Sequence, residues 1–474
     1  MKPDVPLCVD LDGTLIKTDI LLESVVGLLK TQPSYILFIP FWLLKGKAFL
    51  KKAIADLVVV DVDSLPYHSG FLEFLHEEHK NGRKLVLVTA TNVKVARQIA
   101  SHLGIFSEVI GSNGETNLSG KEKVDALDRR FGRQGYDYAA DSYTDLKVWA
   151  HAHRAILVNA SQRLNNPVRN IVSVSRVFND RPKFFPTFFR AIRVQQWAKN
   201  ALIFVPLIVS HNLIKPAPLL NALLAFLAFS LTASSVYLLN DLIDLETDRR
   251  HPRKRHRPFA AGDLSLQIGY VAIPCLFVSS LVIGLTLSFS FVLLLCIYFT
   301  LATTYSFYFK QFALVDVILL AGLYTLRIYA GATAISVVPS EWLLAFSMFI
   351  FLSLALLKRF SELRLIIQTN KVSILGRGYG ASDVAYVENV GLMCGCMAVL
   401  VLALYISSRE VMVLYEQPNL LWLICPMVLY WITRAWLLAN RGQLHEDPLL
   451  FALKDKKSYM IAVATGIIML VASR

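Results

Sequence analysis

Long apolar segments dominate the sequence after residue 185, and they constrain the fold more than any other feature. Several of them approach the roughly 20 residues that a helix needs to cross a bilayer. The shorter ones can tilt or extend into flanking aromatic residues. The sequence therefore predicts an all-α polytopic membrane domain of about nine transmembrane helices. These helices are expected at residues 201–210, 218–239, 268–285, 288–304, 312–335, 341–357, 386–407, 419–437 and 458–472.

The overall composition agrees with a membrane protein of more than one domain. Of the 474 residues, 55% are hydrophobic, and the mean hydropathy of +0.50 is too high for an ordinary soluble enzyme. A net charge of +13 can indicate nucleic-acid binding in a soluble protein. Beside these apolar segments it favours a membrane protein with cations on the cytoplasmic side, and no nucleic-acid partner is expected. The six cysteines follow neither a metal-ligand pattern nor a disulfide framework.

The first part of the chain has a different pattern. Short apolar runs in PLCVDLDG, GRKLVLVTATN and RAILVNAS alternate with polar helical stretches, which predicts a parallel α/β sheet. The N-terminus lacks the charged-then-apolar order of a signal peptide, so this part is expected to stay in the cytoplasm. We predict a soluble domain at residues 1–180, a linker at 181–190 and the membrane domain at 191–474.

Loop charge predicts the orientation of the membrane domain. The loops after the second, sixth and eighth apolar segments are rich in Lys and Arg, whereas the opposite loops carry almost none. Positive loops stay inside, so we expect an integral protein of the inner (cytoplasmic) membrane, with the soluble domain and these loops in the cytoplasm. The cations are Arg249, Arg250, Arg253, Lys254, Arg255, Arg257, Lys358, Arg359, Arg364, Lys371, Arg377, Lys454, Lys456 and Lys457.

Two carboxylates follow the first strand-like run, in Asp10-Leu-Asp12-Gly13-Thr14. Side chains alternate along a strand, so Asp10 and Asp12 share one face of the strand end. This arrangement suits Mg²⁺ and a phosphoryl group, with one Asp attacking and the other moving a proton. The alternative is a glycine turn that carries two solvated acids.

Three later motifs, in order along the chain, make this part resemble the haloacid dehalogenase (HAD) superfamily. They are Thr89 at the end of KLVLVTATN, Lys123 in GKEKVDAL, and Asp141 with Asp145 in AADSYTD. The resemblance implies a Rossmann-like α/β domain with a helical cap at about 15–62 and Mg²⁺-dependent phosphatase activity. It implies catalytic roles for Asp10, Asp12, Thr89 and Lys123, and metal ligation by Asp10, Asp12, Asp141 and Asp145. A degenerate, non-catalytic regulatory module is the alternative.

The expected cap contains PSYILFIPFWLLKGKAFLKK. Its apolar run is too short to cross a bilayer. It is either a cap helix that packs on its own core or an interfacial segment that rests on the membrane surface.

The segment 240–262, NDLIDLETDRRHPRKRHRPFAAG, combines acids and cations at the end of a predicted span. Asp241, Asp244 and Asp248 are spaced i, i+3, i+7, so a continuing helix places them on one face, with Asn240 beside them. Such a face holds Mg²⁺ together with phosphate oxygens, and the following basic run can bind the remaining phosphate charge. The alternative is a topology signal with acids nearby by chance.

This motif makes residues 188–474 resemble the UbiA superfamily of intramembrane prenyltransferases, whose first signature is NDxxDxxxD. Finer matches resemble the decaprenyl-phosphate phosphoribosyltransferase branch. RVQQWAKN at 193–200 is similar to the RPxQWxKN opening of that branch, with Val194 in place of Pro. On a helix, Arg193, Gln196, Trp197 and Asn200 would share one face, with Lys199 pointing elsewhere. HPRKRHRPFAAG and YSFYFKQFALVDV also look like this branch.

Two departures separate the chain from the aromatic-substrate branch of the superfamily. Where that branch has a second acidic motif, this sequence reads LKRFSELRLIIQ, with Lys358, Arg359 and Glu362. In addition, Asp316 and Arg327 lie eleven residues apart in one apolar segment, nearly in line and roughly 16 Å apart along a helix. Charges so deep in a span are usually functional, although an Asp–Arg pair that only joins helices is the alternative.

The resemblance implies transfer of 5-phosphoribosyl from phosphoribosyl pyrophosphate to a polyprenyl phosphate, with release of pyrophosphate. The HAD domain would then dephosphorylate the lipid product, and Mg²⁺ would act in both domains. Transfer of a prenyl group to an aromatic acceptor is the rival reaction, and homo-oligomerisation stays open. Asp241, Asp244 and Asp248 are the expected catalytic metal ligands. The expected substrate-binding residues are Arg193, Gln196, Lys199, Asn200, Asn240, Lys254, Arg257, Lys310, Asp316, Arg327, Lys358, Arg359 and Glu362.

Overall fold

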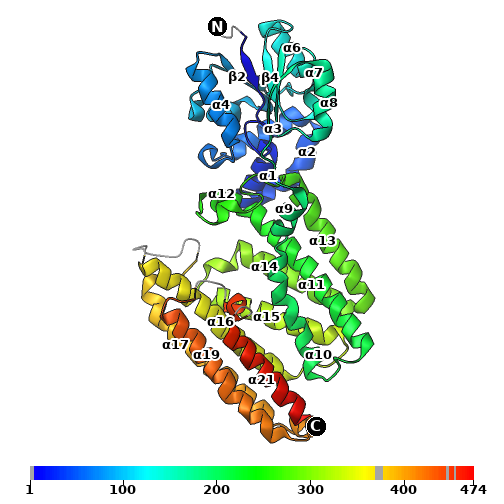
Figure 1. Ribbon diagram of the computed structural model, residues 1–474, viewed down its shortest axis with the longest axis vertical. Coiled ribbons are helices and arrows are strands. Elements are labelled where there is room, and N and C mark those ends of the chain that lie inside the picture. Colours follow the sequence, from blue (N-terminus) through cyan, green and yellow to red (C-terminus); the bar gives the residue numbers. More distant parts are fainter. Residues whose placement is uncertain (1–4, 369–376, 445–447, 453–454, 474) are drawn as a thin grey trace. The chain divides into compact units, whose positions relative to one another are not determined.

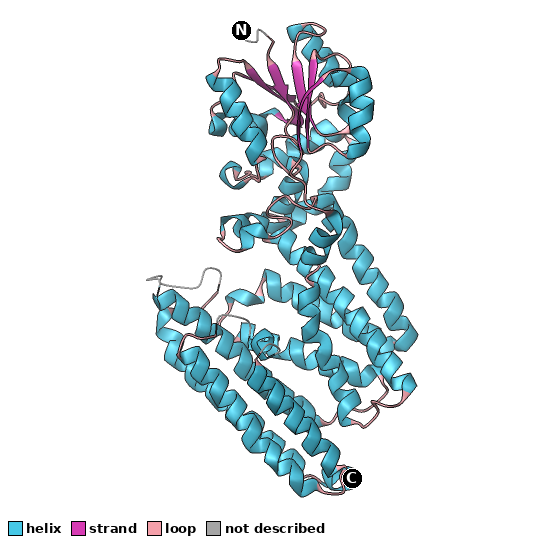
Figure 2. Ribbon diagram, viewed as in Figure 1, coloured by secondary structure: helices cyan, strands magenta, loops and turns pink. Residues whose placement is uncertain are grey.

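The structure is a computed structural model that describes residues 5–368, 377–444, 448–452 and 455–473. The chain forms two compact units, and each unit combines two separate stretches of sequence (Figures 1 and 2). The first unit consists of Met1–Ile192 with Tyr237–Ile273, and the second of Arg193–Val236 with Pro274–Arg474. The predicted domain boundaries at 180 and 190 stay a prediction. The segment 237–273, which the sequence assigns to the membrane half, packs with the N-terminal domain.

The N-terminal domain is built on a six-stranded parallel sheet with the order β3-β2-β1-β4-β5-β6. This confirms the predicted α/β fold. Chain order reverses on the two sides of β1, and in such sheets the site lies at the carboxyl ends of the strands beside that switch point. The strands are β1 (Leu7–Val9), β2 (Leu85–Asn92), β3 (Glu108–Ser112), β4 (Asp137–Ala140), β5 (Arg154–Val158) and β6 (Val174–Phe178).

Both faces of the sheet are covered by helices, as parallel sheets require. Leu7 and Val9 of β1 face one apolar core and Cys8 faces the other, because successive side chains alternate across a strand. α4 and α5 belong to the first core, while α6, α7 and α8 belong to the second (Figure 1). The helices are α4 (Ser69–Lys80), α5 (Val93–Leu103), α6 (Lys121–Phe131), α7 (Leu146–Trp149) and α8 (Gln162–Ile171).

The residues expected to form a cap are helical. α1 (Ile20–Thr31) and α3 (Lys47–Leu57) each bury one face, and η2 (Val62–Ser64) follows them. Between them, η1 (Pro33–Phe38) and α2 (Ile39–Leu44) bury no residue at all. Leu37 is 75% exposed and Leu44 is 86% exposed. The aromatic segment therefore does not pack on the core of its own domain, which favours the interfacial interpretation.

The segment 237–273 is fixed to the cap by ion pairs. After α11 (Pro216–Ile243), the short helix α12 (Leu245–Arg250) presents Arg249 to Glu23 of α1, with N–O distances of 2.8 and 2.5 Å. Both side chains are almost fully buried, at 5% and 9% exposure. Arg250 pairs with Asp61 at 2.7 Å, and the Tyr270 hydroxyl donates to the Leu22 carbonyl. These two arginines, which the sequence assigned to phosphate binding, are engaged by acids of the cap.

The second part of the chain is helical, and seven helices among the described residues are long and apolar enough to cross a membrane. This confirms an all-α polytopic membrane domain. The count of about nine is not confirmed. Residues 201–210 form the end of η4 (Val194–Phe204) and the five-residue α10 (Val205–Val209), and 458–472 lie in the 17-residue α21 (Lys456–Ala472). The seven are Pro216–Ile243, Leu266–Leu287, Phe289–Phe307, Val315–Ala334, Glu341–Leu365, Ala381–Ile406 and Pro418–Asn440.

Several of these helices pack closely through small residues. A Cβ at Gly391 or Gly395 of α17 (Val384–Ile406) would lie within 2.6 Å of Trp436 or Ile432 of α19 (Ile424–Asn440). Small residues let membrane helices approach to van der Waals contact. The other helices are α9 (Phe184–Ala191), α13 (Leu266–Leu287), α14 (Phe289–Phe307), α15 (Val315–Ala334), α16 (Glu341–Gln368), α18 (Arg409–Leu414) and α20 (Pro448–Ala452). The other 3₁₀ helices are η3 (Tyr143–Asp145), η5 (Lys254–His256), η6 (Phe309–Gln311), η7 (Ala381–Asp383) and η8 (Pro418–Leu423).

The exposed aromatic segment at 33–44 leads to a prediction about membrane contact. An environment-sensitive NBD fluorophore at Leu44→Cys should be quenched several-fold more by doxyl lipids in nanodiscs than the same label at Arg129→Cys on α6. Apolar side chains that enter the interface approach the acyl chains. Both labelled proteins carry substitutions of Cys275 and Cys396, the exposed cysteines among the described residues, so that the fluorophore is directed to the introduced cysteine. Equal quenching at the two positions would contradict membrane contact.

Candidate functional site

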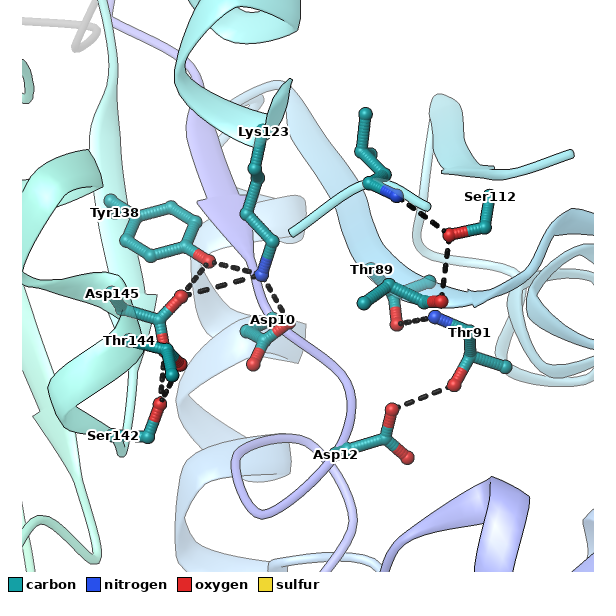
Figure 3. A network of polar contacts seen from close by, with 12 residues as sticks. Asp10, Asp12, Thr89, Thr91, Ser112, Lys123, Tyr138, Ser142, Thr144 and Asp145 are labelled. Atoms are coloured by element: carbon teal, nitrogen blue, oxygen red, sulfur yellow. Dashed lines mark hydrogen bonds and ion pairs between the residues drawn. The ribbon is translucent and has the colours of Figure 1, made fainter. Parts of the chain in front are cut away.

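The HAD-like site lies where the carboxyl ends of β1, β2 and β4 meet (Figure 3). Asp10 follows β1, while Asp145 lies in the turn after β4. Lys123 of α6 donates to Asp10 at 2.9 Å and to Asp145 at 3.3 Å. The Tyr138 hydroxyl also donates to Asp145, at 2.9 Å. Residues from separate parts of the sequence thus converge on one buried network.

Three carboxylates of this site can hold a metal ion. One oxygen each from Asp10, Asp141 and Asp145 lie within 4.8 Å of one another. Divalent cations such as Mg²⁺ prefer this kind of oxygen ligand. Asp12 is not in that group, because its carboxylate accepts hydrogen bonds from the Ile20 amide at 2.8 Å and the Thr91 hydroxyl at 2.7 Å. Metal ligation by Asp12 stays a prediction, and its position suits proton transfer.

Burial sets the electrostatics of the acids. It raises the pKa of Asp10 to about 6 and the pKa values of Asp12 and Asp141 to about 7. Burial opposes the charge on Lys123, but Asp10 and Asp145 outweigh it and raise the pKa of that lysine. One lysine thus faces several buried carboxylates. A cation among them would offset the cost of ionising them all.

Four residues that the sequence did not single out also reach this site. Thr91 lies two residues beyond Thr89 on β2, on the same face, and its amide donates to the Thr89 hydroxyl. Tyr138 of β4 joins the lysine network. Lys51 of cap helix α3 donates to the Ala90 carbonyl at 2.6 Å. Arg181 lies 3.2 Å from Asp141. Of these four residues, only Thr91 had a signal in the sequence, because strand alternation places it on the same face as Thr89.

The acids of the segment 240–248 lie in the first unit. The helix is interrupted at Asp244, so the predicted continuous helix is not formed there. Asp241 and Asp248 are nevertheless bridged by one Nη of Arg257, at 3.2 and 2.5 Å. Lys254 is 3.8 Å from Asp248. Two predicted phosphate-binding cations thus contact the predicted metal ligands.

This second acidic site also fits a cation. Buried oxygens of Asn240 and Asp248 have no hydrogen-bond partner among the described residues. Burial raises the pKa of Asp248, and Arg257 counteracts this effect. Because buried acceptors usually find a hydrogen-bond partner, these oxygens, of which the Asp248 oxygen has only Lys254 at 3.8 Å, fit a metal ion or a ligand donor. The three acids do not form a tight group of ligand atoms among the described residues, since a guanidinium lies between two of them.

In the second unit, Asp316 is the centre of a buried polar cluster. Arg359 donates to it at 2.6 Å and Tyr379 at 2.7 Å, and Arg377 lies at 3.4 Å. Arg359 also binds Glu362 at 2.5 Å. The pair of Asp316 with Arg327, which was the structural alternative for these two charges, is not formed, because Arg359 on α16 binds Asp316. Lys358, also on α16, is half-buried, and Lys310 lies in η6. Lys371 and Lys454 lie outside the described residues.

Arg327 instead joins the stretch RVQQWAKN. From Val194 onward that stretch is 3₁₀ helix rather than α-helix. Arg193, its first residue, has a left-handed backbone with φ of 53°. Asn200 accepts from Arg327 at 2.9 Å and donates to Ser230 at 3.0 Å, and Trp197 donates to Ser234. Gln196 is half-buried, and the amine of Lys199 lies 6.0 Å from the centre of the Tyr324 ring.

Comparisons with known proteins match both halves of the chain. Residues 203–455 match the UbiA prenyltransferase family, and residues 7–149 match the haloacid dehalogenase-like hydrolase family. The uncharacterized protein y4nM of Sinorhizobium fredii is 36% identical, over 98% of this chain and 91% of that protein. Nodulation protein NoeC of Azorhizobium caulinodans is 35% identical, over 61% of this chain and 95% of that protein.

The membrane half is also similar to a decaprenyl-phosphate phosphoribosyltransferase. The enzyme of Mycobacterium tuberculosis is 32% identical over 47% of this chain and 74% of its own length. Among solved structures, a UbiA homolog from Archaeoglobus fulgidus bound to GPP and Mg²⁺ aligns with 16% identity and a TM-score of 0.46. That alignment covers 60% of this chain and 98% of the homolog.

The raised pKa values predict that cation binding at the Asp10 cluster releases protons. Between pH 6 and pH 8, Mg²⁺ affinity should rise by up to about tenfold per unit for each proton displaced, because only ionised carboxylates bind the cation. Calorimetry in two buffers of different ionisation heat measures this release. Asp141→Asn should reduce it. A Mg²⁺ affinity that does not change with pH would contradict the assignment.

Proposed function

The chain belongs to the UbiA prenyltransferase family and carries a haloacid dehalogenase-like hydrolase domain, and we propose that its two halves act in succession on one membrane lipid. The membrane half transfers 5-phosphoribosyl from phosphoribosyl pyrophosphate to a polyprenyl phosphate and releases pyrophosphate. The HAD half then removes the 5-phosphate from the ribose of that lipid. The similarity to decaprenyl-phosphate phosphoribosyltransferase supports the first reaction.

One structural observation carries the proposal that the two reactions are coupled. The segment Tyr237–Ile273, which carries Asp241 and Asp248, belongs to the compact unit that contains the hydrolase domain. Arg249, the residue after Asp248, is held by Glu23 of the cap. The acidic motif of one half and the cap of the other are therefore parts of one folded body.

The chain is an integral membrane protein. We place it in the inner membrane, with the HAD domain and the basic loops in the cytoplasm, because the loops richest in Lys and Arg follow the second, sixth and eighth predicted spans. Phosphoribosyl pyrophosphate is a soluble, highly charged molecule, so a transferase site that faces the cytoplasm would receive it directly.

In the transfer step, the acceptor phosphate oxygen attacks C1 of the ribose as the C1–oxygen bond to pyrophosphate breaks. The acceptor is already an anion, so no general base is required. Asn240, Asp241, Asp244 and Asp248 would hold Mg²⁺, which, when bound, neutralises charge on the departing diphosphate. Arg257 and Lys254 contact these acids, and we propose that they turn to the diphosphate when it binds.

The remaining predicted substrate contacts divide into two groups. Arg327 and Arg359 are buried and engaged by protein side chains, so we propose that they position the helices around the acceptor rather than bind it alone. Lys358 precedes Arg359 on α16 and stays our candidate for the acceptor phosphate. Lys310, with the stretch 193–200, stays a candidate for substrate binding.

In the hydrolase step, Asp10 attacks the phosphorus of the 5-phosphate while the bond to the sugar oxygen breaks. Asp12 gives its proton to that oxygen, a role supported by its raised pKa of about 7. Water then attacks the phosphoryl–Asp10 group, returns a proton to Asp12 and releases phosphate. Lys123 contacts Asp10, and its positive charge stabilises the ionised carboxylate that attacks.

Mass spectrometry of the lipid products tests this function. Full-length protein in nanodiscs, given Mg²⁺, polyprenyl phosphate and labelled phosphoribosyl pyrophosphate, should form polyprenyl-phosphoryl ribose. Asp241→Asn with Asp248→Asn should lower the rate by roughly 10²–10³-fold or more, because the leaving group loses its electrostatic support. Asp10→Asn should accumulate a product that keeps the 5-phosphate.

Two matched controls accompany these variants. Glu246→Gln alters an acid on α12 that is 52% exposed, and Asp63→Asn alters one near the cap that is 77% exposed, so neither should change the products. Label that enters lipid only from a prenyl diphosphate and an aromatic acid would replace our proposal by prenyl transfer. A fully dephosphorylated product from Asp10→Asn would refute the role of the hydrolase.

A further inference from the structure

A cavity of about 300 Å³ lies in the first unit, between the HAD domain and the segment that follows the basic run. This volume is at the lower end of small-ligand pockets, which suits a sugar phosphate. On the HAD side it is lined by residues that include Gly13, Lys17, Asn159, Asp180, Arg181 and Phe184. On the other side it is lined by Gly262, Asp263, Leu264, Ser265 and Ile268.

The cavity begins at the hydrolase site. A Cβ on Gly13 would lie 2.6 Å from a carboxylate oxygen of Asp141, so this wall touches one of the three clustered acids. Arg181 binds the same carboxylate at 3.2 Å, and Lys17 binds Asp180 at 2.8 Å. Arg181 therefore lies at the end of the cavity that is next to the acid cluster, where an incoming phosphate requires a cation, and Lys17 adds a second cation to the lining.

The opposite wall is held tightly in place. Gly262 has a left-handed backbone, with φ of +71°, and a Cβ there would come within 2.5 Å of Lys17. Asp263 accepts a hydrogen bond from Arg190 at 2.8 Å. This wall, which lies in the UbiA-matched part of the chain, is thus fitted against the hydrolase.

The lining combines polar and apolar groups in a way that suits a lipid-linked sugar. Asp263, Ser265 and Asn159 offer hydrogen-bonding groups for sugar hydroxyls. Phe184 and Ile268 give the cavity an apolar side, and Ile268 is the third residue of the candidate span Leu266–Leu287. A soluble sugar phosphate has no group that would use an apolar wall at the start of a membrane span.

We propose that this cavity binds the sugar end of a membrane-anchored sugar phosphate, and that the segment 262–268 selects lipid-linked over soluble substrates for the hydrolase. The inference rests on the proposed function of the HAD half. The phosphate lies toward Arg181 and Asp10, the sugar lies against Asp263, and the lipid leaves along Ile268. Hydrolysis breaks the bond between phosphorus and the sugar oxygen. The sugar keeps that oxygen and gains a proton, and water supplies the new oxygen of the released phosphate.

The test compares two substrates on the full-length protein in nanodiscs. One is synthetic polyprenyl-phosphoryl ribose 5-phosphate and the other is soluble ribose 5-phosphate. Neither depends on the transferase activity of this chain. Asp263→Ala and, separately, Ile268→Ser should lower the ratio of kcat/KM for lipid over soluble substrate at least tenfold. Asp63→Asn is the matched control, and thermal unfolding checks that each variant folds.

The outcomes separate the two levels of the proposal. If the unaltered protein hydrolyses neither substrate, nor p-nitrophenyl phosphate, the proposed phosphatase function fails. If it hydrolyses them and both folded variants keep the original ratio, the cavity does not select the lipid, and this inference fails while the phosphatase function stands. A tenfold fall in either variant, with the control unchanged, supports the assignment. Because Asp263 also binds Arg190, the Ile268 variant keeps the test decisive if Asp263→Ala does not fold.

Discussion

The buried ion pair between Arg249 and Glu23 is the contact on which the arrangement of the first unit depends. When one member of such a pair is removed, the other is left as an uncompensated buried charge, at a cost of about 3–5 kcal/mol. The pair joins the helix after the aspartate motif to the first helix of the cap. The acids at 241–248 therefore lie on a segment that this pair fixes to the cap.

The basic charge of the chain is distributed among several distinct tasks. Arg249 and Arg250 hold the cap, while Arg257 contacts the acids that we propose as metal ligands. In the second unit, Arg359 neutralises Asp316 and Glu362 within the membrane helices. Charges buried so deeply require partners, and the partners explain why a membrane helix can carry them. One sequence feature, a high count of Lys and Arg, thus serves docking and helix packing and, in our proposal, substrate binding.

Local patterns predicted the sheet and the apolar helices, because strand alternation and hydropathy are properties of neighbouring residues. Contacts between distant residues were not predictable in this way. Glu23 and Asp61 look like ordinary solvated helix charges, and their partners lie 226 and 189 residues away. The pairing of Asp316 with Arg359 rather than Arg327 was missed for the same reason. The count of about nine spans is not confirmed, because residues 201–210 form short helices, a feature that hydropathy does not show.

Hydrogen exchange tests most directly whether the aspartate motif and the cap form one body. Full-length protein in nanodiscs is compared with Arg249→Glu and with the charge swap of Glu23→Arg and Arg249→Glu. The account predicts that amides of Ile20–Thr31 and Leu245–Arg250 lose protection together in the single variant, and that the swap restores part of it, because the buried charges are paired again. If α12 lost protection while exchange in α1 stayed unchanged, the two segments would be independent and the account would be contradicted.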